Sequence, residues 1–152
     1  MAVREYSREE LAAQPIGAWS GEAYRRVVGA LREQLAVERL TQPHWWTLNH
    51  VAGKPGEWTR AALIARLRPY DDQGTDFQRV FDDLVKRGWV VENEGRLTLT
   101  AEGEAGRVRA RVRNLRVHKQ THAGIGEEEF ATTIDVLRRM VANLGGNGEL
   151  AE

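Results

Sequence analysis

Few side chains in this 152-residue chain could carry acid–base, nucleophilic or metal chemistry. The chain has four histidines and no cysteine, which excludes disulfides, thiolate nucleophiles and cysteine-ligated metal sites. The only serines are Ser7 and Ser20, and both lie in the N-terminal segment. No glycine-rich phosphate loop follows a predicted strand. The sequence therefore predicts that the protein is not an enzyme and uses no cofactor.

Two of the histidines have a spacing that suits a metal ion. His118 and His122 are four residues apart, so on a helix they lie one turn apart and could bind zinc together. His44 or Glu22 would have to complete the site. A solvated helix end explains the two histidines more simply, and we expect no metal.

The stretch Leu40–Gly53, LTQPHWWTLNHVAG, places two tryptophans side by side. Adjacent helix residues point about 100° apart, so Trp45 and Trp46 cannot share one face. Trp45 shares a stripe with Leu48, which predicts that it packs inward. Trp46 instead shares a face with His50, four residues on.

Composition favours an ordinary globular protein. Hydrophobic residues make up 41% of the chain and charged residues 29%, and 22 basic residues balance 22 acidic ones. No apolar run is long enough for a membrane span and no secretory signal is recognisable, so we expect a cytoplasmic protein. Zero net charge argues against a nucleic-acid binder, but Arg107–Lys119 is locally basic and Gly126–Phe130 is acidic. We interpret the basic run as structural.

Periodicity and capping residues predict the elements that position these side chains. A short helix begins after Ser7 and ends before Pro15, and Ser20 caps the next helix. The further elements expected are helices over about Gly21–Arg39, Thr41–Gly53, Thr59–Leu67 and Thr75–Gly88, a hairpin over Trp89–Thr100, and helices over Ala101 to about His122 and Glu127–Leu144. Thr75 is the expected cap of the fourth of these helices.

This order predicts a mainly α fold with a small β-hairpin wing. The helices at 59–67 and 75–88, followed by a hairpin, form a winged helix-turn-helix. We expect one domain over 1–152, with a DNA-binding lobe at 40–100. The remaining helices, at 1–39 and 101–152, cannot easily bury themselves against so small a lobe, which predicts that they form a dimerisation region with a second copy.

Within that context, several polar side chains are candidates for contacts with double-stranded DNA. They are Arg60, Thr75, Gln78, Arg79, Lys86 and Arg96. In the major groove, Gln can bind adenine through two hydrogen bonds, and Arg can bind guanine or a phosphate. The alternative is that Gln78 closes a capping box with Thr75 and that Arg79 pairs with Asp82 or Asp83.

Four motifs in this order resemble the MarR family of bacterial transcription regulators. LTQPHWWTLNHVA is similar to that family's signature in its second helix, and VFDDLVKRGWV to the end of its recognition helix. LTLTAEGE resembles the strand that leads into the long helix, and GIGEEEF the entry to the last one. The resemblance covers roughly Leu31–Gly145. It implies a homodimer joined by the terminal helices, a palindromic operator DNA and often a small-molecule effector.

The family register also suggests where an effector would lie. It makes Trp45 the core aromatic and places Trp46 and His50 in a cleft between the dimerisation helices and the lobe. Trp19, Tyr24 and Arg113 are further candidates for its walls. Such a cleft suits a small, flat aromatic or anionic ligand. The alternative is that Trp46 only fills the core.

Two departures from the family pattern support an alternative function. The turn RPYDDQG before the recognition helix is acidic, and the wing is short, with only Arg96 near its tip. Together with the neutral net charge, these features favour a winged-helix ligand-binding or protein-interaction module that has lost DNA binding.

Overall fold

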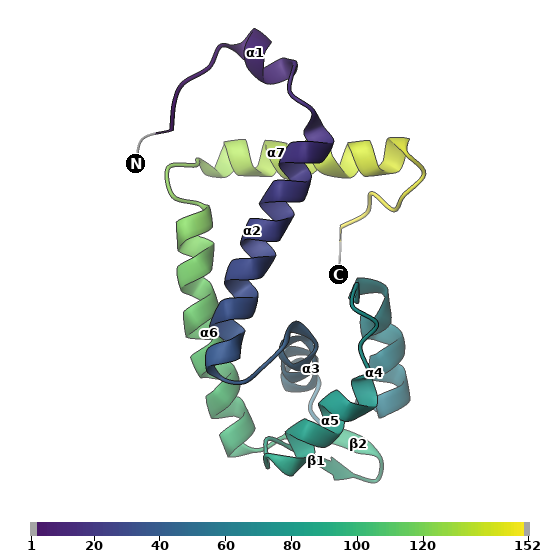
Figure 1. Cartoon of the computed structure of the whole chain (residues 1–152). Helices are drawn as coiled ribbons and strands as arrows, with labels where there is room; N and C mark the ends of the chain where they lie inside the picture. The colour runs from purple at the N-terminus through teal and green to yellow at the C-terminus, as the bar shows by residue number, and fades with distance from the viewer. Residues whose placement is uncertain (1–2, 151–152) are drawn as a thin grey trace. The chain divides into compact units, whose positions relative to one another are not determined.

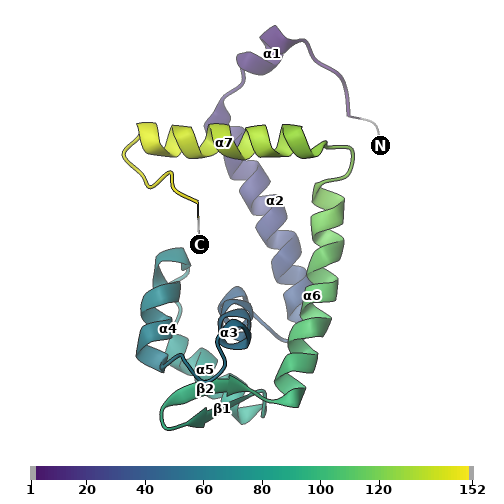
Figure 2. The same cartoon turned by 180° about the vertical axis from the view of Figure 1, so that it is seen from behind.

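The structure is a computed structural model that describes residues 3–150 of the chain (Figures 1 and 2). It is mainly helical, with one two-stranded antiparallel sheet. The elements are α1 (Arg8–Ala12), α2 (Ile16–Val37), α3 (Gln42–Gly53), α4 (Arg60–Leu67), the 3-10 turn η1 (Arg68–Tyr70), α5 (Phe77–Lys86), β1 (Val90–Asn93), β2 (Arg96–Leu99), α6 (Ala101–Thr121) and α7 (Glu127–Asn143). The predicted fold class is confirmed. The chain divides into two compact units, one that reaches Val117 and one that begins at His118.

The core lies in the first unit, between α3, α4, α5 and the hairpin, which we call the lobe. Its buried hydrophobic side chains are Leu35, Leu40, Leu48, Val51, Leu63, Leu67, Phe77, Val80, Phe81, Leu84, Val90, Leu97 and Ala110. They recur at helical spacing on α3, α4 and α5, because each helix turns one apolar stripe inward. Trp45 and Trp46 are both half-buried and both pack against this core, so the two tryptophans share the task that the sequence assigned to Trp45.

Side chains cap the starts of several helices, including the one predicted to begin after Ser7. Ser7 and Glu10 form the reciprocal capping box of α1, with distances of 3.1 and 2.8 Å. Thr59 accepts the backbone N–H of Ala62 at the start of α4, and Thr100 accepts that of Gly103 in α6. These side chains satisfy backbone groups that the first turn of a helix leaves free.

Two helices begin at residues other than those predicted. Helix α2 starts directly after Pro15, so Ser20 lies within the helix and does not cap it. Proline holds its own φ near the helical value and lacks the N–H that a helix start leaves unpaired, which makes the earlier start favourable. Helix α5 is capped by Asp76, whose carboxylate accepts the N–H of Arg79 at 3.3 Å. Thr75 is not the cap, because Asp71 engages both its hydroxyl and its backbone N–H.

The hairpin follows α5 after Gly88, whose φ of 74° ends the helix as the sequence predicts. Strands β1 and β2 pair in antiparallel register, Val90 with Leu99 and Asn93 with Arg96. Glu94 and Gly95 alone make the turn, and both have positive φ, as a tight hairpin requires. The wing is therefore as short as the sequence indicates.

Trp89 attaches the hairpin to α6. A Cβ atom on Gly106 would lie 2.3 Å from the Trp89 ring, and one on Gly103 would lie 2.0 Å from its carbonyl oxygen. Only glycine allows approaches this close. Arg87 and Arg109 lie over the Trp89 ring, at 5.6 and 5.9 Å from its centroid.

The C-terminal end of α2 also contacts α6. Glu38 accepts from Arg109 at 3.1 Å and lies 3.6 Å from Arg113. The views in Figures 1 and 2 agree that α6 passes beside this end of α2.

The second unit consists of the end of α6, α7 and the tail. The rings of His118 and His122 stack at 4.1 Å between centroids, and Phe130 lies 4.2 Å beyond His122. Many apolar side chains of α7 are exposed, among them Phe130, Ile134, Met140 and Val141. None of the helices over residues 3–150 combines the length and the apolar character that a bilayer crossing requires.

Candidate nucleic-acid interface

Helix α5 presents one polar face to solvent. Its buried side holds Phe77, Val80, Phe81 and Leu84, while Gln78, Arg79, Asp82 and Lys86 are exposed. This sharp division fixes the rotation of the helix on the core. The helix follows α4 and η1 and precedes the hairpin, which is the order of a winged helix-turn-helix.

Two basic side chains on this face have no partner among residues 3–150. Among the described residues, neither the Arg79 guanidinium nor the Lys86 ammonium makes a hydrogen bond or an ion pair. The predicted alternative, in which Arg79 pairs with Asp82 or Asp83, is wrong, because those carboxylates bind Arg60, His44 and Arg87 instead. The two charges are therefore available to an anionic partner.

Arg60, at the start of α4, in contrast has partners within the chain at each of its three side-chain nitrogens. Its Nη1 donates to Gln78 at 3.0 Å and to Asp82 at 2.8 Å, and its Nε and Nη2 donate to Glu92 on β1. The hydrogen bond that Arg60 donates to Glu92 is the main cause that raises the pKa of Arg60 above its ordinary value. The predicted capping box between Gln78 and Thr75 is wrong, since the Gln78 oxygen faces Arg60.

The carboxylates of the acidic turn before α5 bind other groups of the same chain. Asp71 accepts the hydroxyl of Thr75 at 2.7 Å and its backbone N–H at 2.7 Å, and these hydrogen bonds lower the pKa of Asp71. Asp72 accepts the Tyr24 hydroxyl and lies 3.4 Å from Arg32, both on α2. The turn thus ties α2 to the start of α5, and the Thr75 hydroxyl is not free.

Arg96 stands at the start of β2, beside the turn of the wing. Its Nη1 donates to the carbonyl oxygen of Glu57 at 2.6 Å, while the side chain stays exposed. The backbone of Leu97 pairs on the same side with Trp58 and Gly56, at 2.9 Å in each case. The loop before α4 therefore supports the wing and holds Arg96 near the exposed face of the lobe.

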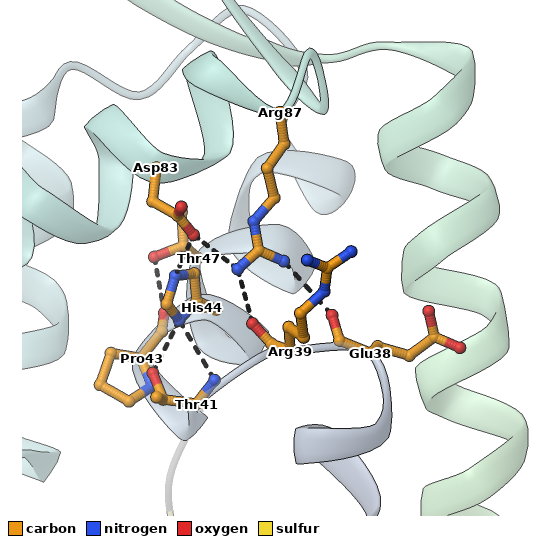
Figure 3. A network of polar contacts seen from close by, with 8 residues as sticks. All are labelled: Glu38, Arg39, Thr41, Pro43, His44, Thr47, Asp83 and Arg87. Carbon is orange, nitrogen blue, oxygen red and sulfur yellow. Dashed lines mark hydrogen bonds and ion pairs between the residues drawn. The ribbon is translucent and has the colours of Figure 1, made fainter.

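A second polar network anchors α5 from its other side (Figure 3). The backbone N–H of Thr41 donates to His44 Nδ1 at 3.1 Å, so Nε2 carries the hydrogen and donates to Asp83 at 2.9 Å. Arg87 contacts the same Asp83 oxygen at 2.7 Å and donates to the carbonyls of Glu38 and Arg39. This network joins the link between α2 and α3 to the end of α5.

Burial governs the charge state of this network. His44 is only 9% exposed, and burial lowers its pKa, although the hydrogen bond to Asp83 offsets part of the effect. Partial burial acts to raise the pKa of Asp83, but the hydrogen bonds from Arg87 and His44 outweigh it and lower the pKa. Neutral His44 beside ionised Asp83 and Arg87 is therefore the favoured state.

Sequence reasoning missed this role of His44, which it considered only as a metal ligand. A signal was present, because His44 lies three residues after the N-cap Thr41, where a capping box normally has Glu or Gln. Glu22, the other candidate third ligand, pairs with Arg25 and Arg26. Within residues 3–150, no three His, Asp or Glu side chains gather closely enough to hold a metal ion.

The residues expected to line a ligand cleft do not converge on one point. His50 Nδ1 lies 2.8 Å from the Trp46 carbonyl oxygen, and its ring packs edge-on against Trp58. Trp19 donates to Gln14 near the start of α2. Tyr24 and Arg113 have separate partners, Asp72 and Glu38. Among the described residues, the contact within this set joins the His50 ring to the backbone of Trp46.

The basic run of α6 is partly neutralised within the chain. Arg107 pairs with Glu104 at 2.6 Å and donates to Asn49, and Arg109 and Arg113 share Glu38. These contacts agree with the structural interpretation of the run.

Comparison with protein-family models finds no match, and no curated protein is similar enough to count as a relative. Solved structures, however, match over most of the chain, and many of them are MarR family regulators. A MarR family transcriptional regulator from Silicibacter pomeroyi is 17% identical, with 91% of this chain and 99% of that chain covered and a TM-score of 0.69. A MarR family protein of Mycobacterium tuberculosis, solved in complex with DNA, is 22% identical over 88% and 99% of the two chains, with a TM-score of 0.63.

The same mycobacterial protein, solved in complex with salicylic acid, matches with 21% identity, coverage of 88% and 100%, and a TM-score of 0.59. At sequence identities this low, the structural similarity establishes the fold alone. The chain has the winged-helix fold of MarR family regulators, as the resemblance of its motifs predicts.

Proposed function

We propose that this protein is a DNA-binding transcriptional regulator rather than an enzyme. The observation that carries the proposal is the pair of unpartnered cations, Arg79 and Lys86, on the exposed face of α5. A polar helix face of this kind, next to a short hairpin, is what a winged helix-turn-helix presents to the major groove. A structure with the same fold is in complex with DNA, which supports the assignment.

The geometry suggests a role for each cation. Arg79 lies in the first turn of α5, where a recognition helix reaches base edges, and its guanidinium fits guanine O6 and N7 or a phosphate. Lys86, at the other end of the helix, fits a phosphate. Arg96 would add a contact from the wing. Thr75 is the weakest of the predicted contacts, because Asp71 holds its hydroxyl.

We further propose that the protein acts as a homodimer on palindromic DNA. Exposed apolar side chains on α6 and α7 support this proposal, including Val112 at 49%, Leu115 at 46% and Ile134 at 40%. Two recognition helices related by a twofold axis would contact half-sites about 34 Å apart. Sedimentation equilibrium should give twice the chain mass of 17.2 kDa. A mass of one chain at micromolar concentration would contradict the proposal.

A small aromatic carboxylate is the proposed class of effector. The pair of Trp46 and His50 on α3 supports it, as does the salicylic acid complex of a protein with the same fold. Titration with salicylate should quench the intrinsic tryptophan fluorescence saturably. Trp46→Phe should remove most of the quenching, whereas Trp19→Phe, at a 60% exposed position, should leave it. Equal quenching in both variants would exclude Trp46 from the site.

The test of DNA binding is selection from random duplex DNA, followed by a salt titration on the enriched sequence. If Arg79, Lys86 and Arg96 of both protomers contact phosphates, the slope of log affinity against log salt should be roughly −5. Arg79→Ala should weaken binding by about tenfold or more. Arg26→Ala removes the same charge from an 83% exposed side chain on α2 and should leave affinity unchanged.

A second candidate function is a ligand-binding or protein-interaction module without DNA binding. The observation that favours it is the capture of Arg60 by Asp82 and Glu92, which removes one expected cation from the face of the lobe. If no sequence is enriched and no binding occurs at low salt, this candidate replaces the DNA-binding proposal.

A further inference from the structure

A carboxylate stands in the middle of the face that would meet DNA. Asp82 lies on the exposed side of α5, one turn after Gln78, and its side chain is 68% exposed. Phosphates repel an unpaired carboxylate, so an acidic residue here normally weakens binding to any DNA sequence. Asp82 is not unpaired, however, because Arg60 donates to its Oδ1 at 2.8 Å.

Arg60 is placed to neutralise this face rather than to reach outward. Its side chain is only 23% exposed, and its guanidinium lies 5.7 Å from the centroid of the Phe81 ring. Because Nε and both Nη atoms already donate to acceptors on α5 and β1, a phosphate would compete with Asp82 and Glu92 for this guanidinium. Arg60 therefore serves as a counter-charge beneath the exposed side chains.

The same guanidinium orients Gln78. A guanidinium only donates hydrogen bonds, so the amide oxygen of Gln78 must face Arg60, at 3.0 Å. The amide NH₂ group is then the part of Gln78 left for another partner. Because its oxygen already accepts from Arg60, Gln78 is less suited to the two hydrogen bonds that adenine recognition requires.

From this arrangement we propose that Asp82 is a specificity-determining residue that selects cytosine in the major groove, with Arg60 as its positioning residue. The second carboxylate oxygen, Oδ2, has no hydrogen-bond partner among the described residues and can accept from the N4 amino group of cytosine. Guanine and thymine present only acceptors at this edge, and adenine places its N7 acceptor beside its amino group. Cytosine, which offers an amino group with no acceptor beside it, is therefore the base that best fits a carboxylate.

The inference rests on the proposed DNA-binding function and makes it more specific. The competing possibility is that Asp82 only repels phosphates and so lowers the affinity for every DNA sequence equally. Glu92 separates the two, because it is a carboxylate on the same Arg60 and its Oε1 is already engaged by the guanidinium. Both substitutions remove one negative charge beside Arg60, but only Asp82 lies on the exposed face of α5.

The experiment is selection from random duplex DNA with the wild-type protein, Asp82→Ala and Glu92→Ala. The wild-type and Glu92→Ala motifs should share one position per half-site at which cytosine is preferred by roughly tenfold. Asp82→Ala should enrich the same motif with that one preference lost. Replacing the C·G pair by T·A should then weaken wild-type binding roughly tenfold and Asp82→Ala binding less than twofold.

Three results would overturn the inference. Asp82→Ala could enrich the unchanged motif with higher affinity, which would mean that Asp82 only lowers the affinity for DNA in general. Glu92→Ala could lose the cytosine preference as well, which would mean that the preference depends on the negative charge beside Arg60 and not on a contact from Asp82. In both cases the wild type still binds a defined DNA site, so the proposed function stands. If the wild-type protein enriches no sequence, the proposed function and this inference fail together.

Discussion

The two sides of the lobe hold α5 by different physical means. On the inner side, which contacts α2 and α6, His44, Asp83 and Arg87 form a partly buried network, and the Trp89 ring lies against the glycines of α6. On the outer side, Arg60 gathers Gln78, Asp82 and Glu92 under an exposed face. The inner network centres on His44, whose side chain is 11% exposed, and the two glycines leave no room for a larger residue beside Trp89. The outer contacts include Asp82, whose side chain is 68% exposed and can exchange its partner for solvent.

This difference separates stability from recognition. Buried polar groups that lose a partner keep the full desolvation cost, whereas exposed ion pairs contribute between zero and about 1 kcal/mol. The inner side should therefore set the free energy of unfolding and the angle of α5. The outer side should set affinity and sequence preference with little effect on folding. Four substitutions or conditions test this separation, in order of decreasing effect.

The largest effect is expected at Gly103, where a Cβ atom would lie 2.0 Å from the carbonyl oxygen of Trp89. Gly103→Ala must push the hairpin away from α6, because two backbone segments cannot deform cheaply. We expect a loss of about 3 kcal/mol in the free energy of unfolding, measured by urea denaturation. Gly17→Ala, with no atom within 4 Å of the new methyl group, should be neutral or slightly stabilising. Equal stability of the two variants would mean that Trp89 does not anchor the lobe.

The next effect is expected at His44. His44→Ala leaves the Thr41 N–H without its acceptor and removes the hydrogen bond to Asp83, and it also opens space near the core. We expect a loss of about 2–3 kcal/mol by urea denaturation. His44→Gln, whose amide supplies both an acceptor and a donor, should recover part of that loss. An unchanged denaturation midpoint in His44→Ala would show that the inner network does not stabilise the fold.

Stability should also depend on pH through His44. Burial holds its pKa below the usual 6.5, so the unfolded chain binds a proton at a higher pH than the folded chain. The number of bound protons is then larger in the unfolded state, and stability falls as pH is lowered through and below 6.5. The slope should reach at most about 1.4 kcal/mol per pH unit.

The control for this pH effect is His44→Gln, which has no titrating group at that position. The difference between the two pH profiles, recorded from pH 8 to pH 5, cancels the contributions of the other histidines. Parallel profiles would contradict the assignment of a neutral, buried His44.

The smallest effect on stability is expected on the outer side, at Arg60. Its partners Asp82 and Glu92 have side chains that are 68% and 29% exposed, so solvent screens much of the interaction. Arg60→Ala should cost less than about 1 kcal/mol in the free energy of unfolding. A loss as large as that of His44→Ala would erase the distinction between the two sides.

The local signals of the sequence predicted most of the elements, because each depends on residues within a few positions of one another. The Ser7 and Thr59 caps, Gly88 as a helix stop and the Glu94–Gly95 turn act on the backbone beside them. The misplaced starts of α2 and α5 show where local signals compete. Pro15 starts the helix before Ser20 can cap it, and Asp71 engages Thr75 so that Asp76 becomes the cap.

The sequence predicts which residues the candidate site contains, but not which of their side chains form hydrogen bonds and ion pairs with one another. Amphipathic periodicity alone places Gln78, Arg79 and Lys86 on one exposed face of a helix, and the structure agrees. Which charges remain free depends on residues far away in the chain. Glu92 is 32 positions from Arg60, and Asp83 is 39 positions from His44.

The helices, the hairpin and the face that α5 exposes can therefore be predicted from local sequence, since periodicity, capping and turn residues act over short distances. Three features follow only from the folded arrangement: Arg60 is a counter-charge, Arg79 has no partner within residues 3–150, and His44 is a buried link between α3 and α5. Hydrogen bonds and ion pairs require approach within about 3 Å, and only folding brings such distant residues that close.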